Sequence, residues 1–159
     1  DKKNIDLFTR HAILTETEMR ARYEIHLENY CKVSAIEANT LLEMAMRGVL
    51  PAVARYSGDL AKGMAHKQEA QFSDLCRIEK YLIQELGIQG GQLLDVCQSL
   101  SQALENAPAA DSGIDAARYY RSEIVTRTQK AGELIGQLES LVDAKAWPYP
   151  TYADILFSV

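Results

Sequence analysis

Apolar residues recur every three or four positions along most of this chain, a spacing that is typical of helices with one buried face. Strand-like alternation is absent, and glycine and proline number only 9 and 4. The pattern predicts an all-α fold in one helical domain over 1–159, an elongated antiparallel bundle because long helices with short connections pack antiparallel. Its predicted parts are a short helix over 3–10, long helices over 15–62, 66–106 and 115–145, and an aromatic and proline-rich tail over 147–159.

The first long helix has a clear start and one internal interruption. Thr15 is followed three residues later by Glu18, the spacing of a capping box. Pro51 lacks a backbone donor and crowds the carbonyl of Arg47. Since the apolar rhythm continues to Leu60, we expect a kink near 47–51 and no helix end there. Beyond residue 31 the apolar positions are too many for one stripe, which indicates cover on more than one side.

The second long helix contains three glycines, Gly87, Gly90 and Gly91, each of which weakens a helix by about 1 kcal/mol relative to alanine. The apolar phase is nevertheless the same before and after them. We therefore expect a helix that is continuous or only locally distorted. The alternative is two helices joined by a loop at 87–91.

The tail reads WPYPTYADILFSV, which is unusual because chain ends are normally polar and poorly ordered. Its apolar content predicts a docking segment, with Thr151 capping a last short turn and Asp154 at the third position of that turn. Glu37, which lies among apolar residues of the first long helix, is expected to form an interhelical or interface ion pair. The candidate docking residues are therefore Trp147, Tyr149, Tyr152, Leu156, Phe157 and Glu37.

Composition narrows the possible partners. The net charge is −5 with an isoelectric point near 5.2, and no basic patch dominates, so neither nucleic acid nor an anionic membrane is an expected partner. No run approaches the roughly 18 apolar residues of a membrane span. Three widely spaced cysteines support neither a disulfide framework nor a zinc site, which favours reduced thiols and a cytoplasmic location. Because the first residue is Asp and not Met, we also expect a piece of a larger protein.

Sequence motifs for catalysis are missing. The chain has no P-loop, no GxGxxG and no GxSxG, and none of its histidines follows a glutamate in the Glu-x-x-His pattern of di-iron bundles. His26 could be a ligand or a base, but we favour a half-buried or surface histidine; for Cys97 we favour a place in the core over a role as a nucleophile. Glu28 with Lys32, and Glu43 with Arg47, have the spacing of surface ion pairs. We therefore expect no catalytic residue, no cofactor site and no metal site in this chain.

The segment RYYRSE, at 118–123, allows two interpretations. Arginine beside tyrosine is a combination found in binding patches. The alternative is a helix start whose tyrosines lean on neighbouring residues while their hydroxyls remain in water, and we favour this second interpretation.

Several stretches together resemble the C-terminal helical region of the type III glutamine synthetases, which are large bacterial enzymes. The resemblance spans nearly the whole chain and is weakest over 63–112. It is carried by ARYEI at 21–25 with the following Leu27, Glu28, Tyr30 and IEA at 36–38, by LPAV at 50–53, by AARYYRSEIV at 116–125 and by the tail from 138 onward.

The resemblance implies a parent enzyme that ligates ammonia to glutamate with ATP and a divalent metal. Its catalytic residues would lie upstream, and none can be carried onto a position of this chain. The chain would then be a non-catalytic domain with an assembly role, and its partners would be the parent catalytic domain and the neighbouring subunits of a homo-oligomer. The tail would fill a groove on the bundle or on that catalytic part. The alternative is a free-standing helical module that binds other proteins.

Overall fold

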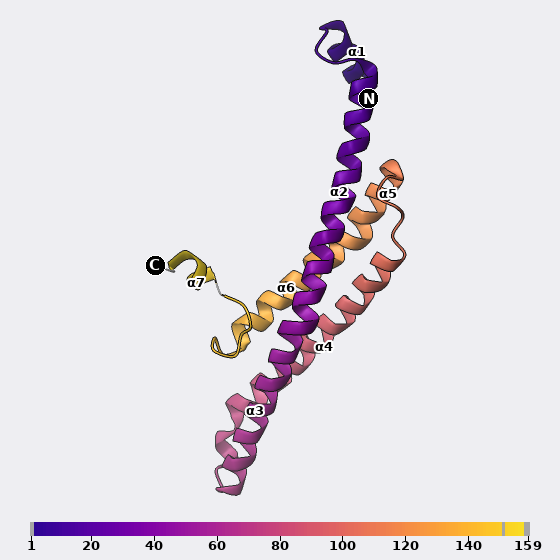
Figure 1. Cartoon of the computed structure of the whole chain (residues 1–159). Coiled ribbons are helices and arrows are strands. Elements are labelled where there is room, and N and C mark those ends of the chain that lie inside the picture. Colours follow the sequence, from indigo (N-terminus) through magenta and orange to yellow (C-terminus); the bar gives the residue numbers. More distant parts are fainter. Residues whose placement is uncertain (1, 151, 158–159) are drawn as a thin grey trace.

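The computed structural model describes residues 2–150 and 152–157 of the chain. Every regular element within those residues is helical (Figure 1), so the all-α prediction is confirmed. The helices form three rods, consecutive rods running in opposite directions, with a small helix before the first rod and another after the last. The first rod is α2 (Glu16–Met44), the π-helical η1 (Ala45–Val49) and α3 (Leu50–Glu69); the second is α4 (Arg77–Glu105); the third is α5 (Gly113–Tyr119), the π-helical η3 (Tyr120–Val125) and α6 (Thr126–Leu141); the remaining elements are α1 (Lys2–Arg10), the 3₁₀ turn η2 (Ser73–Leu75) and α7 (Tyr152–Phe157).

The first rod begins at the predicted capping box. The Glu18 backbone N–H donates to the Thr15 hydroxyl at 3.2 Å, and the Thr15 backbone N–H donates to the Glu18 carboxylate at 2.8 Å. These bonds satisfy two amides that a helix start leaves without intrahelical partners. The bond from the Thr15 backbone N–H, and a further one in which the Thr15 hydroxyl donates to the same carboxylate at 2.8 Å, hold the pKa of the Glu18 carboxyl below its ordinary value.

The interruption at Pro51 is a π-helical segment inside a continuous rod. Pro51 sits in the first turn of α3, where a missing N–H is tolerated. Immediately before it, the Leu50 N–H donates to the carbonyl of Ala45, five residues back and not four. The helix continues beyond Pro51, as the pattern predicted, and the kink predicted near 47–51 corresponds to the wider π turn.

The predicted end of the first long helix near 62 is wrong, and so is the predicted start of the next near 66. The first rod continues to Glu69, and α4 begins only at Arg77. Gly63, the residue directly after the predicted end, is an ordinary helical position where a Cβ would meet nothing within 4 Å. A single glycine lowers helix propensity without ending a helix when the flanking turns are packed.

The real turn is formed by Gln71, which has a positive φ of 63°. The Gln71 N–H donates to the Gln68 carbonyl at 3.0 Å, and the Phe72 N–H donates to the Lys67 carbonyl at 2.8 Å. This is the hydrogen-bond pattern of a Schellman motif, which usually has glycine in the left-handed position. Because glutamine occupies that position, composition carried no signal for the turn.

The glycines of the second rod do not break it: α4 is one helix from Arg77 to Glu105, as the preserved phase predicted. Gly90 is buried, and a Cβ there would lie 3.5 Å from Val53 Cγ1. The third rod ends at Leu141, before the predicted 145, since Val142 is already extended with φ −84° and ψ 141°. The Asp143 carboxylate accepts from the Lys145 N–H at 2.8 Å and fixes the turn that follows.

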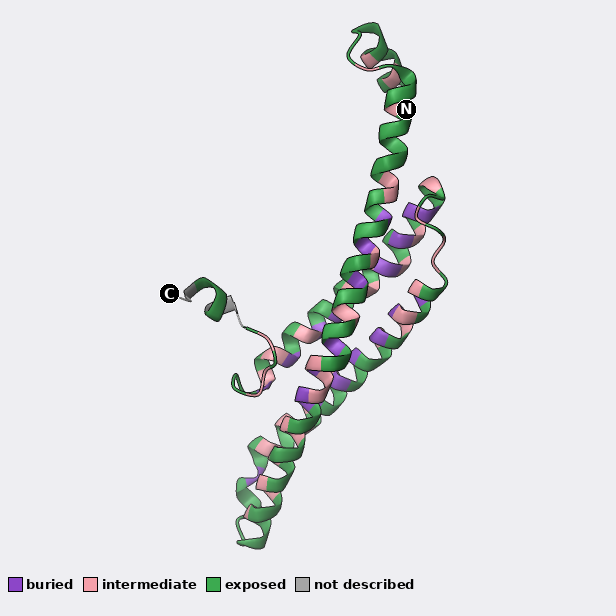
Figure 2. Ribbon diagram, viewed as in Figure 1, coloured by how far each residue is buried: buried purple, intermediate pink, exposed green. Residues whose placement is uncertain are grey.

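Two clusters form the interior of the bundle, seen as the purple inner faces in Figure 2. One lies where the first rod, α4 and α6 meet, and includes Val49, Leu86, Leu93, Leu134 and Leu138. The other lies where α2 meets α4, α5 and η3, and includes Cys31, Ala38, Leu100, Tyr120 and Ile124. Within the described residues, no helix has the length and apolar content needed to cross a membrane.

Candidate docking surfaces

The N-terminal part of the first rod extends past the rest of the bundle. In Figure 1, α1 and the first turns of α2 lie beyond the end of α5. The buried residues of α2 begin only at Cys31, and the turns before it are largely exposed (Figure 2). Tyr23 and Ile25 are 54% and 53% exposed. We call residues 2–26 the overhang, an apolar-bearing surface that this chain leaves uncovered.

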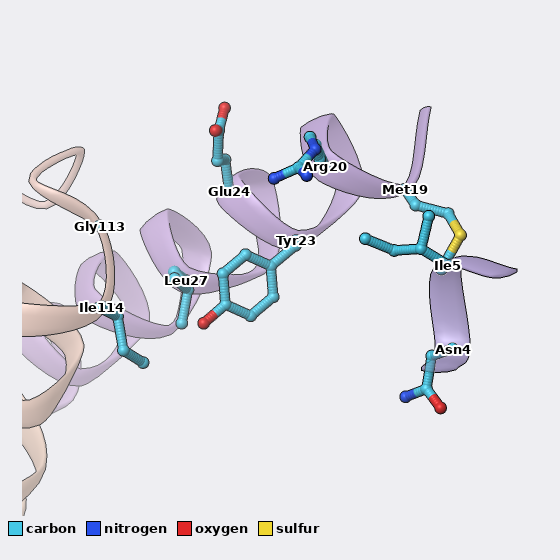
Figure 3. A pocket seen from close by; sticks show the side chains of 9 residues that line it. All are labelled: Asn4, Ile5, Met19, Arg20, Tyr23, Glu24, Leu27, Gly113 and Ile114. Carbon is cyan, nitrogen blue, oxygen red and sulfur yellow. The ribbon is translucent and has the colours of Figure 1, made fainter. Parts of the chain in front are cut away.

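A hollow of about 550 Å³ opens at the base of the overhang. Figure 3 shows the Tyr23 ring lying between Leu27 and Ile114 on one side and Ile5 and Met19 on the other. The charged residues in its wall are Arg20 and Glu24, and the Arg20 guanidinium is paired with Glu16 at 2.6 Å. The hollow thus offers mainly apolar contact area, with Arg20, Tyr23 and Glu24 as its ionisable side chains.

The first part of the tail lies on the bundle. Trp147 and Tyr149 are half-buried and pack against the cluster at the middle of the rods. The Tyr149 hydroxyl donates to the backbone carbonyl of Met44 at 3.1 Å, one residue before η1. A Cβ at Gly48 would lie 2.4 Å from the Tyr149 hydroxyl and 2.7 Å from the ring carbon beside it. Gly48 therefore makes room for the tyrosine, which the sequence alone did not indicate.

The end of the tail does not lie on the bundle. Figure 1 shows α7 standing away from the rods, and Leu156 is 72% exposed. The side chain of Leu156 thus fills no groove on this bundle, contrary to one of the two expected positions. The side chains of Tyr152 and Phe157, and Thr151 as a helix cap, lie outside the part of the chain that the structure describes.

A second hollow, of about 430 Å³, lies between α2 and α6 beside Tyr149. We call it the tail hollow. Glu37 is on its rim, exposed, and has no ion-pair partner among the described residues; the expected interhelical pair is therefore not formed, and a pair across an interface stays a prediction. The other main lining residues are Ile36, Thr40, Met44, Gly132, Ile135 and Tyr149.

The tyrosines of RYYRSE are structural parts of the bundle. Tyr120 is only 7% exposed, and its ring meets that of Tyr119 edge to face at 6.4 Å. The Tyr119 hydroxyl donates to the Ala103 carbonyl at 2.9 Å. The expectation that these hydroxyls remain in water is wrong for Tyr119, because α4 passes close enough to supply a backbone acceptor.

The remaining candidates lie where the sequence placed them. His26 is exposed, and Cys97 is buried, which raises the pKa of its thiol. Glu43 and Arg47 form their ion pair at 2.7 Å, and Glu28 pairs with Lys32. In the described ranges 2–150 and 152–157, no three His, Cys, Asp or Glu side chains gather in a way that could hold a metal ion.

Comparison with known proteins shows which proteins this bundle is similar to. The profile described as "Glutamine synthetase C-terminal domain" matches residues 1–68. The chain is 31% identical, over 99% of its length, to a protein named glutamine synthetase from Butyrivibrio fibrisolvens. It is 27% identical, over 98% of its length, to one named type-3 glutamine synthetase from Dictyostelium discoideum. A glutamine synthetase of Bacteroides fragilis is 23% identical over 92% of the chain.

The chain is homologous to the C-terminal domain of glutamine synthetases. It spans about a fifth of the length of these relatives, 22%, 22% and 21% respectively. No solved structure matches it. The residues matched by the glutamine synthetase C-terminal profile comprise α1, α2, η1 and nearly all of α3. The overhang and the α2 wall of the tail hollow are therefore within the part that the family profile describes.

Proposed function

We propose that this chain is the non-catalytic helical domain of a longer glutamine synthetase, and that it contributes surface for assembly. The observation that carries the proposal is the match of 92–99% of the chain to about a fifth of each relative. The parent enzyme would ligate ammonia to glutamate at the expense of ATP. The bundle alone would have no such activity.

Two uncovered surfaces, the overhang and the tail hollow, support an assembly role. Isolated exposed apolar residues are normal on any protein, but the overhang combines exposed Tyr23 and Ile25 with a hollow at its base. Apolar surface gathered in this way marks protein contact sites. The occupants would be the catalytic part of the parent chain and neighbouring subunits of a homo-oligomer.

ATP and a divalent metal would be bound elsewhere in the parent. Magnesium prefers carboxylate oxygens and phosphate oxygens as ligands, and the described residues gather no such cluster. Neither hollow has a phosphate-binding glycine loop on its wall. The described residues therefore do not fit these ligands, and no catalytic step is assigned to them.

The proposal is tested first in the full-length protein that contains this chain. Tyr23→Glu with Ile25→Glu places two charges on the overhang, and we expect a lower oligomeric mass by light scattering after gel filtration. The control is Ile78→Glu. Ile78 is 70% exposed at the start of α4, close to the C-terminal end of the first rod, and this substitution is expected to leave the mass unchanged. An unchanged mass in the Tyr23/Ile25 variant would contradict the assembly role.

Two further measurements address the non-catalytic and fragment parts of the proposal. The isolated chain should form no glutamine from glutamate, ammonium and ATP, and measurable turnover would overturn the assignment. The reading frame upstream of Asp1 should continue into a large catalytic region. An initiator methionine directly upstream, preceded by a stop codon, would instead favour the free-standing interaction module.

A further inference from the structure

α2 carries two stripes of residues at helical spacing, and this chain buries one of them. The buried residues of α2 are Cys31, Ser34 and Ala38. The second stripe lies on an exposed side of the helix (Figure 2), and we call it the outer stripe. It consists of Asn29, Val33, Ile36 and Thr40. Because Val33 and Ile36 are 52% and 66% exposed, the apolar positions that indicated cover on a second side are left uncovered by the described residues.

The spacing of the outer stripe is that of a helix that pairs with another helix. Its residues are four, three and four positions apart, which is the a and d spacing of a coiled coil, with Val33 at an a position and Ile36 at a d position. A β-branched residue at a is favoured in parallel two-stranded coiled coils. A second copy of the chain presents the same stripe, so two copies can bury each other's stripes by self-complementary contact.

The charges beside the outer stripe favour a second copy in the parallel orientation. Lys32 comes directly before Val33, and Glu37 directly after Ile36; these are the g and e positions, whose ion pairs set the orientation of paired helices. In a parallel pair, a g residue meets the e residue five positions further along the partner, so each Lys32 meets the partner's Glu37. An antiparallel pair that aligns Val33 with the partner's Ile36 would instead bring Lys32 beside the partner's Lys32.

Both charged groups are available for this contact. Glu37 is exposed on the rim of the tail hollow and has no ion-pair partner among the described residues. The Lys32 ammonium is paired with the Glu28 carboxylate at 2.5 Å, but its side chain is 58% exposed, and an ammonium has three N–H donors. Two pairs of Lys32 with the partner's Glu37 can therefore form by symmetry without breaking an ion pair within either chain.

We propose that the outer stripe of α2 pairs in parallel with the outer stripe of a second copy of this chain, with Lys32 bonded to the partner's Glu37 on both sides. The pairing extends over about 16 Å, from Asn29 to Thr40. It ends at Glu43, whose carboxylate is engaged in an ion pair within its own chain. The partner's helix also covers the α2 wall of the tail hollow.

A short stripe is sufficient because α2 is helical before it pairs. Isolated helices shorter than about 12–15 residues are marginal in water, so a free peptide with this stripe would have to fold and associate together. In this chain, packing against the other rods already holds α2. Association then orders fewer groups, and we expect a weak dimer that dissociates on dilution. The inference deepens the assembly role proposed above and rests on it.

The first test is a disulfide between two copies of Val33→Cys. In a parallel pair the two a positions at one level face each other, so their Cα atoms come within the roughly 7 Å that a disulfide needs. The native Cys31, Cys76 and Cys97 are buried and do not compete. The chain contains both buried clusters that hold its rods and is therefore tested by itself. Under mild oxidation we expect a linked dimer on a non-reducing gel.

Ile88→Cys is the matched control for this cross-link. Ile88 on α4 is 49% exposed, against 52% for Val33, and its variant should stay monomeric. Equal linking of both variants would show random collision. A dimer that forms only when Val33→Cys is mixed with Ile36→Cys would show an antiparallel pair, and no dimer would show that the outer stripe does not pair with a second copy. Each of these three results overturns the proposal.

Exchanging the two charges tests the ion pairs directly. Lys32→Glu places carboxylate against carboxylate, and Glu37→Lys places ammonium against ammonium. By equilibrium sedimentation between about 5 and about 200 µM, each substitution should raise the dissociation constant of the dimer about tenfold, because two pairs change together. The double variant restores opposite charges and should return the constant to within about twofold of the native value. A double variant as weak as the single ones would contradict these pairs.

Lys62→Glu controls for the change of net charge. Lys62 is also paired within its own helix, to Asp59, and its variant should leave the dissociation constant unchanged; a tenfold rise there would contradict a specific pairing at Lys32. These substitutions lie outside the overhang, so the two proposals can fail separately. If the chain stays monomeric while Tyr23→Glu with Ile25→Glu still lowers the mass of the full-length protein, the assembly role stands and the outer-stripe pairing is overturned.

Discussion

The two ends of the first rod differ although one continuous helix joins them. At its C-terminal end, α3 turns back at Gln71 and packs along α4, with the Lys67 ammonium paired to the Glu79 carboxylate across the turn. At its N-terminal end, the overhang has a good cap, and the other rods reach only its base, where Gly113 and Ile114 of α5 lie beside Tyr23. Apolar residues at helical spacing thus predict that a helix has a face to bury. Whether this chain buries that face depends on whether another rod lies beside it.

The two ends should differ most in how much stability the chain loses when one apolar side chain is removed. Leu86, which faces the first rod, is 1% exposed, and Leu86→Ala should lower the free energy of unfolding by about 2–5 kcal/mol because it leaves a cavity. Ile25→Ala on the overhang should change it by no more than about 0.5 kcal/mol. Urea denaturation of the isolated chain measures both. Equal losses would mean that the overhang is covered in solution.

A substitution in the turn after α3 should raise the stability of the chain instead of lowering it. Gln71→Gly relieves the left-handed backbone that glutamine adopts at φ 63°, and we expect stability to rise by about 1 kcal/mol. Gln68→Gly is the matched control, since the same exchange inside the last turn of α3 should lower stability by about 1 kcal/mol. Thermal melts report both effects. A loss in both variants would show that the Schellman geometry does not persist in solution.

The ion pair across the turn predicts a response to acid. Lys67 donates a hydrogen bond to Glu79, which holds the pKa of that carboxyl below its ordinary value of 4.5 and raises the pKa of the Lys67 ammonium. A carboxyl with a lowered folded-state pKa stabilises the fold above its unfolded pKa, and this contribution is lost as the pH falls through the folded value. Between pH 7 and about 4.5 the turn should therefore be unaffected, and below that range it should loosen.

Hydrogen exchange of the amides at 70–76 measures this loosening against pH. Glu79→Gln removes the carboxyl and should remove the extra acid response of these amides relative to the rest of the chain. If the variant and the native chain respond alike, the ion pair does not hold the turn.

The smallest expected effect belongs to the overhang. Thr15→Ala removes the hydroxyl that caps α2, an interaction worth about 1 kcal/mol, so exchange of the amides at 16–19 should rise about fivefold. The urea midpoint should stay the same, because the overhang shares no buried contact with the rods. Thr17→Ala is the control and should change neither quantity. A shift of the midpoint in Thr15→Ala would mean that the overhang unfolds together with the bundle.

Residues that interact with near neighbours along the chain were predictable from the sequence. The capping box at Thr15 and Glu18, the pair of Glu43 with Arg47 and the uninterrupted α4 each depend on spacings of three or four residues. Such spacings determine contact whenever the segment is helical. The predicted all-α fold follows from the same periodicity, and the resemblance of 21–25 and of the tail to glutamine synthetases was visible from the residues themselves.

Tertiary structure decided the features that depend on partners distant in sequence. Gly48 and Tyr149 are separated by about a hundred residues, yet the missing Cβ of one makes the site of the other. The turn at Gln71 depends on a left-handed residue that no glycine or proline announced, and α4 had to pack on α3 to hold it there. Leu156 and Tyr23 are apolar, but their exposure follows from where the rods end. Local spacing thus fixed the helices of this protein, while the surfaces it offers to others depend on which helices lie beside them.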